Sequence, residues 1–177
     1  LINDLDEIPP VITVLSGTDT VEMGSTWTDA GATSDGGEEV TTTGTVTTTT
    51  VGEYTITYSA TDAEENTGTA TRTVTVVDTT APVITVLSGT DTVEMGSTWT
   101  DAGATADGGE TVTSSGTVDT TIVGTYTITY SATDAEGNEG TATRTVTVVD
   151  TTAPVITVTS GTDTVEMGST WTDAGAT

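Results

Sequence analysis

Residues 123–149 read VGTYTITYSATDAEGNEGTATRTVTVV, and residues 51–77 repeat this stretch with three changes. In its first half, Tyr126, Ile128 and Tyr130 alternate with threonines, and the second half alternates in the same way. A period of two residues predicts strands that each bury one face. Between the halves, DAEGN suits a hairpin turn, because Gly and Asn tolerate the positive φ that such turns require. The stretch therefore predicts an antiparallel pair of strands.

The whole chain of 177 residues repeats with a period of 72. Its three tryptophans lie 72 residues apart, and residues 7–78 match residues 79–150 at 60 of 72 positions. Residues 151–177 repeat residues 79–105 with one change. We therefore predict four parts: the end of a preceding unit or a linker (1–6), a first repeat (7–78), a second repeat (79–150) and the first part of a third, incomplete repeat (151–177).

Each repeat also contains shorter segments typical of strands. In repeat 2 these segments are residues 83–87, 92–95, 111–113 and 116–118, and Gly-rich turns separate them. No segment has a helical period. Six or seven short strands in 72 residues predict an all-β fold, with one small antiparallel β-sandwich domain per repeat.

Four blocks of sequence carry a resemblance to a known family: DTTAPVIT (78–85), GSTWTDAGAT (96–105), VGTYTITY (123–130) and ATDAEGN (132–138). In this order they resemble the bacterial Ig-like repeats of large microbial cell-surface proteins, including adhesins and surface-layer (S-layer) proteins. The resemblance implies tandem Ig-like β-sandwich domains and an extracellular or cell-surface location. Members of the family often carry a longer Asp-rich loop after Gly-Ala-Thr. Here that loop is reduced to residues 106–110 (ADGGE), with fewer carboxylates for a cation.

The composition excludes several functions. The chain has 27 acidic and two basic residues, a formal charge of −25, and no His, Cys or Lys. The usual general bases, thiolate nucleophiles and zinc ligands are therefore missing, and the carboxylate pairs Glu38–Glu39 and Glu64–Glu65 are only partly kept between the repeats. We predict no enzyme and no required cofactor. A polyanion repels phosphates, and no run approaches the ~20 apolar residues of a membrane span, so we expect no nucleic-acid partner and no direct membrane insertion.

The few large and basic side chains are predicted to stabilise the fold. The tyrosines share the phase of the buried strand face: Tyr54, Tyr58, Tyr126 and Tyr130. The Trp of each repeat is expected to anchor the core or a loop rather than to stack on a sugar. Arg72 and Arg144 lie mid-strand, in phase with valines. We expect each to pair with a nearby carboxylate; the alternative is a contact with the acidic surface of a neighbouring domain or subunit.

The hairpin turns carry the arrangement that best suits a ligand. Each turn places three oxygen-bearing side chains at alternate positions, and a hard divalent cation such as Ca²⁺ prefers oxygen ligands at short spacing in flexible loops. In the Ig-like topology, the Asp that precedes a repeat approaches the turn of that repeat. The candidate Ca²⁺ ligands at these inter-domain junctions are Asp62, Glu64, Asn66, Asp78, Asp134, Glu136, Asn138 and Asp150. The alternative is a solvated polar turn, stabilised by hydrogen bonds to its own Asp.

Two functions remain open from the sequence. The first is a structural cell-surface protein whose repeats build an extracellular layer, filament or stalk with a polyanionic, cation-attracting face. Its partners would be copies of itself or neighbouring Ig-like domains, together with divalent cations. The second is an adhesin module that binds a host or environmental glycan or protein through its loops. The near-identity of the two full copies, with no loop singled out for variation, favours the first function.

Overall fold

The computed structural model describes residues 7–177 of the chain. These residues contain strands β1 to β12 and no helix. Within this described part, nothing has the length and hydropathy of a membrane-spanning helix. The chain divides into two compact units, one with residues 7–82 and 133–139 and the other with residues 83–132 and 140–177.

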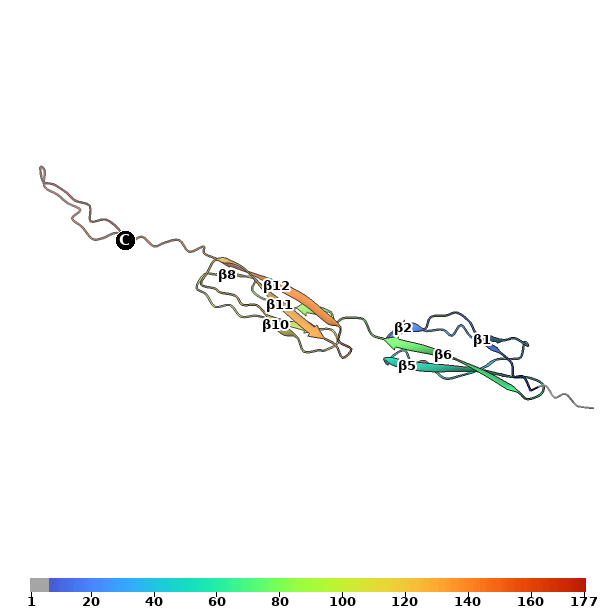
Figure 1. Ribbon diagram of the computed structural model, residues 1–177. Helices are drawn as coiled ribbons and strands as arrows, with labels where there is room; N and C mark the ends of the chain where they lie inside the picture. The colour runs from blue at the N-terminus through green and yellow to red at the C-terminus, as the bar shows by residue number, and fades with distance from the viewer. Residues whose placement is uncertain (1–6) are drawn as a thin grey trace, which may run out of the picture. The chain divides into compact units, whose positions relative to one another are not determined.

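The first repeat has six strands in two sheets (Figure 1). The small sheet pairs β1 (Ile12–Val14) with β3 (Ala32–Ser34). The larger sheet has four strands in the order β2 (Thr20–Glu22), β6 (Thr67–Val77), β5 (Gly52–Thr61) and β4 (Thr41–Thr43). Because β1 lies against both β5 and β6, the two sheets form a small sandwich.

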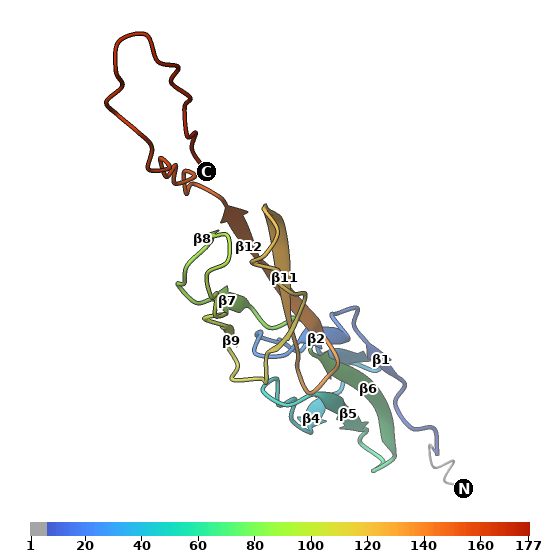
Figure 2. The ribbon, with the colours of Figure 1, turned by 90° about the vertical axis from the view of Figure 1, so that its left-hand side faces the viewer.

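The second repeat has the same arrangement. Figure 2 labels its small sheet, in which β7 (Ile84–Val86) pairs antiparallel with β9 (Ala104–Ala106). The larger sheet has the order β10 (Thr113–Ser115), β11 (Gly124–Thr133), β12 (Glu139–Val149) and β8 (Thr92–Glu94). The long pair β11 and β12 is the stretch whose alternation predicted two strands, and this prediction is confirmed.

The all-β sandwich is confirmed, and most of its strand pairs are antiparallel as predicted, but each repeat also contains one parallel pair. β2 runs parallel to the end of β6, and β8 runs parallel to the end of β12. Parallel neighbours need a long crossover, and the strands β3 to β5 provide it in repeat 1. Two further details differ from the expectation. Residues 116–118 are not a strand, and β9 is a strand that the alternation did not indicate.

The buried cluster of each repeat lies on its larger sheet. In repeat 1, Val21, Val74 and Val76 form a buried cluster, against which Trp27 and Tyr54 pack. Complete burial of one such side chain contributes about 1.5–3 kcal/mol. Tyr58 and Tyr130 are fully buried, whereas Tyr54 and Tyr126 are half-buried at the edge of the clusters. The tyrosines therefore belong to the core as predicted, and Trp27 and Trp99 are packing anchors.

Candidate functional site

Each repeat holds one buried arginine in a hydrogen-bond network. In repeat 1, Arg72 on β6 donates from Nη1 to Asp19 Oδ1 at 2.7 Å and from Nε to the hydroxyl of Tyr58 at 3.2 Å. Its Nη2 donates to the carbonyl oxygen of Leu15. The hydroxyl of Tyr58 in turn donates to Asp29 Oδ1 at 2.5 Å. All these residues belong to repeat 1, so the pairing of Arg72 with a nearby carboxylate is confirmed.

The network of repeat 2 repeats these contacts. Arg144 donates to Asp91 Oδ1 at 2.6 Å and to the hydroxyl of Tyr130 at 3.2 Å. Burial raises the pKa of the Tyr130 hydroxyl, and the hydrogen bond to Asp101 adds to this shift. Burial opposes ionisation of Asp101, but hydrogen bonds from Tyr130 and Gly103 and the charge of Arg144 outweigh it and lower the pKa of the carboxyl. The network therefore holds one cation between ionised carboxylates.

The Ser-Gly-Thr-Asp turn is shaped to admit the guanidinium. A Cβ added at Gly17 would lie 2.5 Å from Nη1 of Arg72, and one at Gly89 would lie 2.7 Å from Nη1 of Arg144. No real Cβ tolerates such a distance to a neighbouring atom, so a side chain at this position would displace the arginine. Glycine at this position thus permits the close approach of the guanidinium. The network is a structural device, because each of its groups is already bonded within its own repeat.

The residues after β6 are fastened to the repeat that precedes them. Glu22, at the end of β2, accepts hydrogen bonds at 2.8 Å from the backbone N–H of Thr79 and at 2.9 Å from its hydroxyl. The hydroxyl of Thr80 also donates to Glu22, at 2.9 Å. We call this arrangement the linker clamp. The backbone N–H of Thr79 is the main cause that lowers the pKa of Glu22, followed by the two threonine hydroxyls.

A second linker clamp follows repeat 2. Glu94 accepts hydrogen bonds at 2.7 and 2.8 Å from the backbone N–H and hydroxyl of Thr151. Thr152 adds donors at 3.1 and 2.9 Å. The hydrogen bond from the Thr151 hydroxyl is the largest cause that lowers the pKa of Glu94. Because the clamp recurs at the equivalent positions, it is a property of the repeat. The sequence analysis missed it.

Three of the predicted Ca²⁺ ligands lie together. Asp78, Asp134 and Glu136 each offer a carboxylate oxygen, and these oxygens lie within 4.8 Å of one another. All three residues belong to the same compact unit. Asn138 joins them, because its Nδ2 donates to the carbonyl oxygen of Asp78 at 3.1 Å and to Asp134 Oδ2 at 2.8 Å. Three carboxylates at this separation match the donor chemistry of a hard divalent cation.

The other predicted ligands have different surroundings. Asp62 Oδ1 accepts the backbone N–H groups of Glu64 and Asn66 at 3.0 and 2.8 Å, which is an Asx turn. Asp134 organises its own turn in the same way, and the hydrogen bond from Asn138 is the main cause that lowers its pKa. Asp150 Oδ1 accepts the N–H of Thr152 at 3.2 Å. Among residues 7–177, neither Asp62 nor Asp150 belongs to a group of three carboxylates. Asp6, which would stand before Asp62 as Asp78 stands before Asp134, lies outside the described residues.

The family follows from a comparison with family models. The model described as "Bacterial surface protein, Ig-like domain" matches residues 12–76 and again residues 85–148. The chain belongs to this family. Each Ig-like match begins in or beside the first strand of a repeat and ends near the end of its last strand. The tandem Ig-like fold expected from the four sequence blocks is therefore confirmed.

Two further similarities accompany the family match. The Ig-like chain is 42% identical over 122 residues to hyalin of Lytechinus variegatus, an alignment that covers 61% of this chain and 23% of hyalin. The chain thus spans about a quarter of the length of that relative. A solved structure titled "Protocadherin gammaB7 EC3-6 cis-dimer structure" is similar over 80% of this chain and 51% of that chain, with 14% identity and a TM-score of 0.32. The family assignment places the chain among surface proteins.

Proposed function

We propose that the chain is a structural segment of an extracellular layer, filament or stalk, in which Ig-like repeats provide length and a polyanionic face. The observation that carries this proposal is the linker clamp, present after each full repeat. Glu94 accepts four hydrogen bonds and Glu22 accepts three. These bonds tie the connecting residues to the end of a strand in the preceding repeat. Such fastening of the residues between repeats suits a chain whose role is to provide length.

The charge supports the same role. With −25 charges and each arginine buried, the exposed charged groups are carboxylates. Repulsion between two such surfaces discourages wrong edge-to-edge pairing of strands. The same negative surface attracts cations. Its range is about 8 Å at 0.15 M salt and about 3 Å at 1 M, so copies of the chain would approach closely only in salty surroundings.

The clamp provides the test of the proposal. In Glu22→Gln the side chain keeps one carbonyl acceptor and loses its charge, so the order of Thr79 and Thr80 should fall. The measurement is the ¹⁵N heteronuclear NOE of these two residues in the full chain. Glu53→Gln is the matched control, because Glu53 is an exposed residue of the same repeat outside the clamp. Unchanged NOE values in Glu22→Gln would contradict a role of the clamp in stiffening the array.

Electron microscopy separates the structural role from the adhesive one. The structural proposal predicts ordered sheets or fibres of the purified chain at high salt with millimolar Ca²⁺. The alternative, an adhesin module, is supported by the family and by the loops that the fold exposes, and it predicts specific signals on a glycan array. Monodisperse particles together with specific glycan binding would reject the structural role in favour of the adhesive one.

We also propose Ca²⁺ as a ligand of Asp78, Asp134 and Glu136, supported by the proximity of their oxygens. A cation bound to the folded state raises the melting temperature by mass action. We expect millimolar Ca²⁺ to raise it relative to chelator, and Asp134→Asn to reduce this rise. Asp62→Asn is the matched control, because it alters the same turn in repeat 1. Equal melting temperatures of the parent chain in Ca²⁺ and in chelator would refute the proposal.

A further inference from the structure

One aspartate in each repeat fastens the loop after the small sheet to the start of that repeat. In repeat 2, Asp107 Oδ1 accepts the backbone N–H of Val83 at 2.8 Å, and the N–H of Asp107 donates to the carbonyl oxygen of Val83 at 3.2 Å. In repeat 1, Asp35 and Val11 form the same two hydrogen bonds, at 2.9 and 3.2 Å. Both pairs lie directly beyond the paired strands of the small sheet. Each aspartate therefore extends that pairing by one position.

The same carboxylates also lie beside the nitrogen of the residue that follows them. Gly108 N–H donates to Asp107 Oδ1 at 3.1 Å, and Gly36 N–H donates to Asp35 Oδ1 at 3.0 Å. Elsewhere in residues 7–177, the aspartates that accept an N–H within their own turn accept it from a residue two or four positions on. Asp35 and Asp107 are thus the carboxyl groups that the described fold brings against their own next peptide nitrogen.

The residue that follows is glycine at both places, and both places are open to water. The other aspartates of residues 7–177 precede threonine or alanine. Asp107 and Gly108 are exposed, and so are their counterparts in repeat 1. A Cβ added at Gly108 would collide with Oε1 of Glu110, and the same collision recurs in repeat 1. Because glycine has no Cβ, its nitrogen is unshielded and its backbone rotates through conformations that other residues rarely adopt.

We propose that Asp107–Gly108 and Asp35–Gly36 are sites of spontaneous isoaspartate formation in the folded chain. The nitrogen of Gly108 attacks the side-chain carbonyl carbon of Asp107 in its acid form, and the new C–N bond closes a five-membered succinimide ring. The hydroxyl group of the acid leaves as water together with the amide proton. This inference goes beyond the proposed function and does not rest on it.

Hydrolysis of the ring completes the modification. Water adds to the main-chain carbonyl carbon and breaks its bond to the Gly108 nitrogen, which takes up a proton. The chain then continues through the former side chain of Asp107. One water is lost and one is gained, so the product has the mass of the parent chain, and the reaction needs no oxidant or metal.

Proximity favours the reaction at these two places. A reaction between groups held side by side is much faster than the same reaction between separate molecules, provided that the reacting atoms approach to roughly 3–3.5 Å. The hydrogen bond from Gly108 keeps its nitrogen 3.1 Å from Asp107 Oδ1, and rotation of the exposed carboxyl group turns its carbon toward that nitrogen. Asp101 is arranged differently, because its carboxylate accepts the N–H of Gly103 and lies 3.5 Å from Nε of Arg144.

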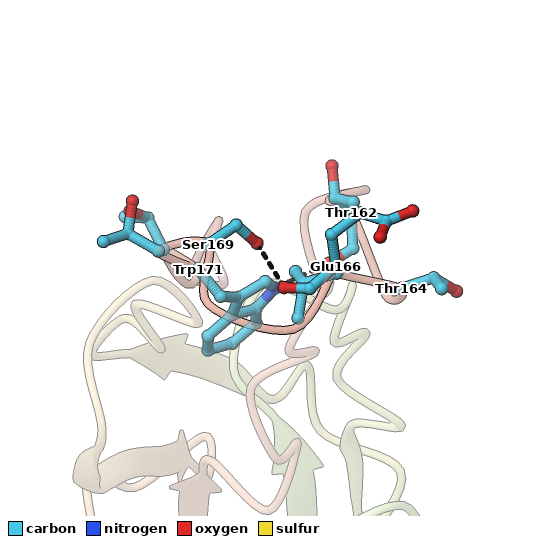
Figure 3. Close-up of a pocket in the computed structure, with 8 residues that line it drawn as sticks. Thr162, Thr164, Glu166, Ser169 and Trp171 are labelled. Atoms are coloured by element: carbon cyan, nitrogen blue, oxygen red, sulfur yellow. Dashed lines mark hydrogen bonds between the residues drawn. The ribbon is translucent and has the colours of Figure 1, made fainter.

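The surface depression beside Trp171 provides a contrast. Figure 3 shows Glu166, Ser169 and Trp171 there, and Ser169 Oγ donates to the carbonyl oxygen of Glu166 at 2.7 Å. The acidic side chain at this place is an exposed glutamate, which would have to close a larger ring, and the next residue is Met167 instead of glycine. Exposure of a carboxylate alone therefore does not make such a site.

Conversion removes the fastening that the aspartate provides. The isoaspartyl linkage adds a methylene carbon to the main chain and leaves the free carboxylate directly on the α-carbon. The carboxylate of residue 107 then no longer meets the N–H of Val83 in the original geometry, and both hydrogen bonds between these residues are disturbed. We therefore expect a converted repeat to unfold at a lower urea concentration than the parent repeat.

The test uses the full chain, kept folded at neutral pH and physiological temperature for several weeks. An isoaspartyl methyltransferase with a labelled methyl donor detects the product, and mass spectrometry of fragments from an Asp-specific endoproteinase locates it. We expect label at residues 35 and 107 and none at Asp29 or Asp101. Gly108→Ala should remove the label of residue 107 and keep that of residue 35, which is the internal control.

A second variant separates the chemistry from the shape of the loop. Asp107→Glu keeps a carboxylate at this position but should not become labelled there, because its ring would be larger. The indole N–H signal of Trp99 reports whether repeat 2 is folded in each variant. The same signal should show a lower urea midpoint for the converted fraction of the parent chain than for its unconverted fraction.

The proposal fails if the folded chain stays unlabelled, whether or not the chain unfolded in urea becomes labelled. Equal labelling of Asp29 and Asp101 would also overturn it, because neither neighbouring glycine nor proximity would then select the site. Undiminished label at residue 107 in Gly108→Ala would exclude the role of the glycine. An unchanged urea midpoint of the converted fraction would contradict the fastening by Asp107.

Discussion

The two complete repeats have the same interior and differ at exposed or half-buried positions. They are identical at 60 of 72 positions, and the twelve differences include none of the residues that contact the buried arginine. The distances agree as well, with 2.7 and 2.6 Å for the two arginine–aspartate pairs. Side chains that bring distant segments together are thus the same in both repeats, so both adopt the same fold.

Three of the differences change the backbone conformation or the hydrogen bonds of a turn or loop. Glu65 has φ of 70°, where repeat 2 has Gly137 with φ of 95°. Ser34 Oγ donates to Glu38 Oε2, whereas Ala106 leaves Glu110 Oε2 buried without a hydrogen-bond partner. Thr47 is replaced by Asp119, whose Oδ1 accepts the backbone N–H of Thr121 at 2.9 Å. Because the cores are the same, we expect these turn and loop residues to determine which of the two repeats is more stable.

Removal of the buried arginine should have the largest effect, and this effect should be equal in the two repeats. Arg72→Gln and Arg144→Gln each remove a buried guanidinium from its ion pair with a largely exposed aspartate and leave a buried tyrosine hydroxyl without its donor. We expect about 2 kcal/mol of destabilisation, the same in either repeat. The measurement is urea unfolding followed by the indole N–H signals of Trp27 and Trp99, one in each repeat. Clearly unequal losses would show that the two interiors are not equivalent.

Exchange of the turn residue should shift the repeats in opposite directions. A side chain in the left-handed region costs roughly 1–2 kcal/mol, so Glu65→Gly should stabilise repeat 1 by about 1 kcal/mol. Gly137→Glu should destabilise repeat 2 by a similar amount. The same two indole signals report each repeat, and the unaltered repeat in each variant is the control. Shifts of the same sign would contradict the argument from φ.

Restoration of the missing serine should stabilise repeat 2 more modestly. Ala106→Ser provides a donor for Glu110 Oε2, and a hydrogen bond of this kind contributes about 1 kcal/mol. Ser34→Ala should remove the equivalent bond from repeat 1. Urea unfolding of the double exchange, which interchanges the two residues, should leave the summed stability of the chain nearly unchanged. A loss in both repeats would mean that the loop conformations differ.

The smallest expected effect depends on pH. The hydroxyl and backbone N–H of Thr121 lower the pKa of Asp119. The carboxylate therefore contributes stability that is complete above the pKa of the unfolded chain and disappears as the pH falls through the folded pKa. Asp119→Thr should lower the urea midpoint of repeat 2 at pH 7 and leave it unchanged at pH 2. The loss of an equal amount at both pH values would assign the effect to packing instead.

Local pattern predicted the parts of the fold that depend on neighbouring residues. The alternation around Tyr126 and Tyr130 identified β11, and the DAEGN block identified the hairpin turn. The segment of β2 and β8 was predicted as a strand, but its parallel direction was not predictable in this way. Its three residues carry too little pattern to show direction, and its partner β6 lies more than forty residues later. Strand β9 is equally short, and the alternation of its three small residues is too brief to predict a strand, although Thr105 is exposed and Ala104 and Ala106 are half-buried.

The candidate site was predictable only in part. The expectation that Asp78 approaches the turn of Asp134 depended on topology, and the structure brings these residues together with Glu136. The linker clamp had one signal that was not used: a glutamate after Thr-Val and a Thr-Thr pair after Asp recur at the same spacing in both repeats. Glu22 and Thr79 are 57 residues apart, so no local rule connects them.

The sequence by itself determined the period of 72, the strand character of the long alternating stretches and the inward phase of the tyrosines, because these depend on steric preferences and on a side-chain period that neighbouring residues share. Only the tertiary structure decided which carboxylates meet the two arginines and which glutamate holds each linker. Those contacts join residues 43 to 58 positions apart. At such separations the partner is selected by the packing of the sheets, which leaves no trace in local pattern.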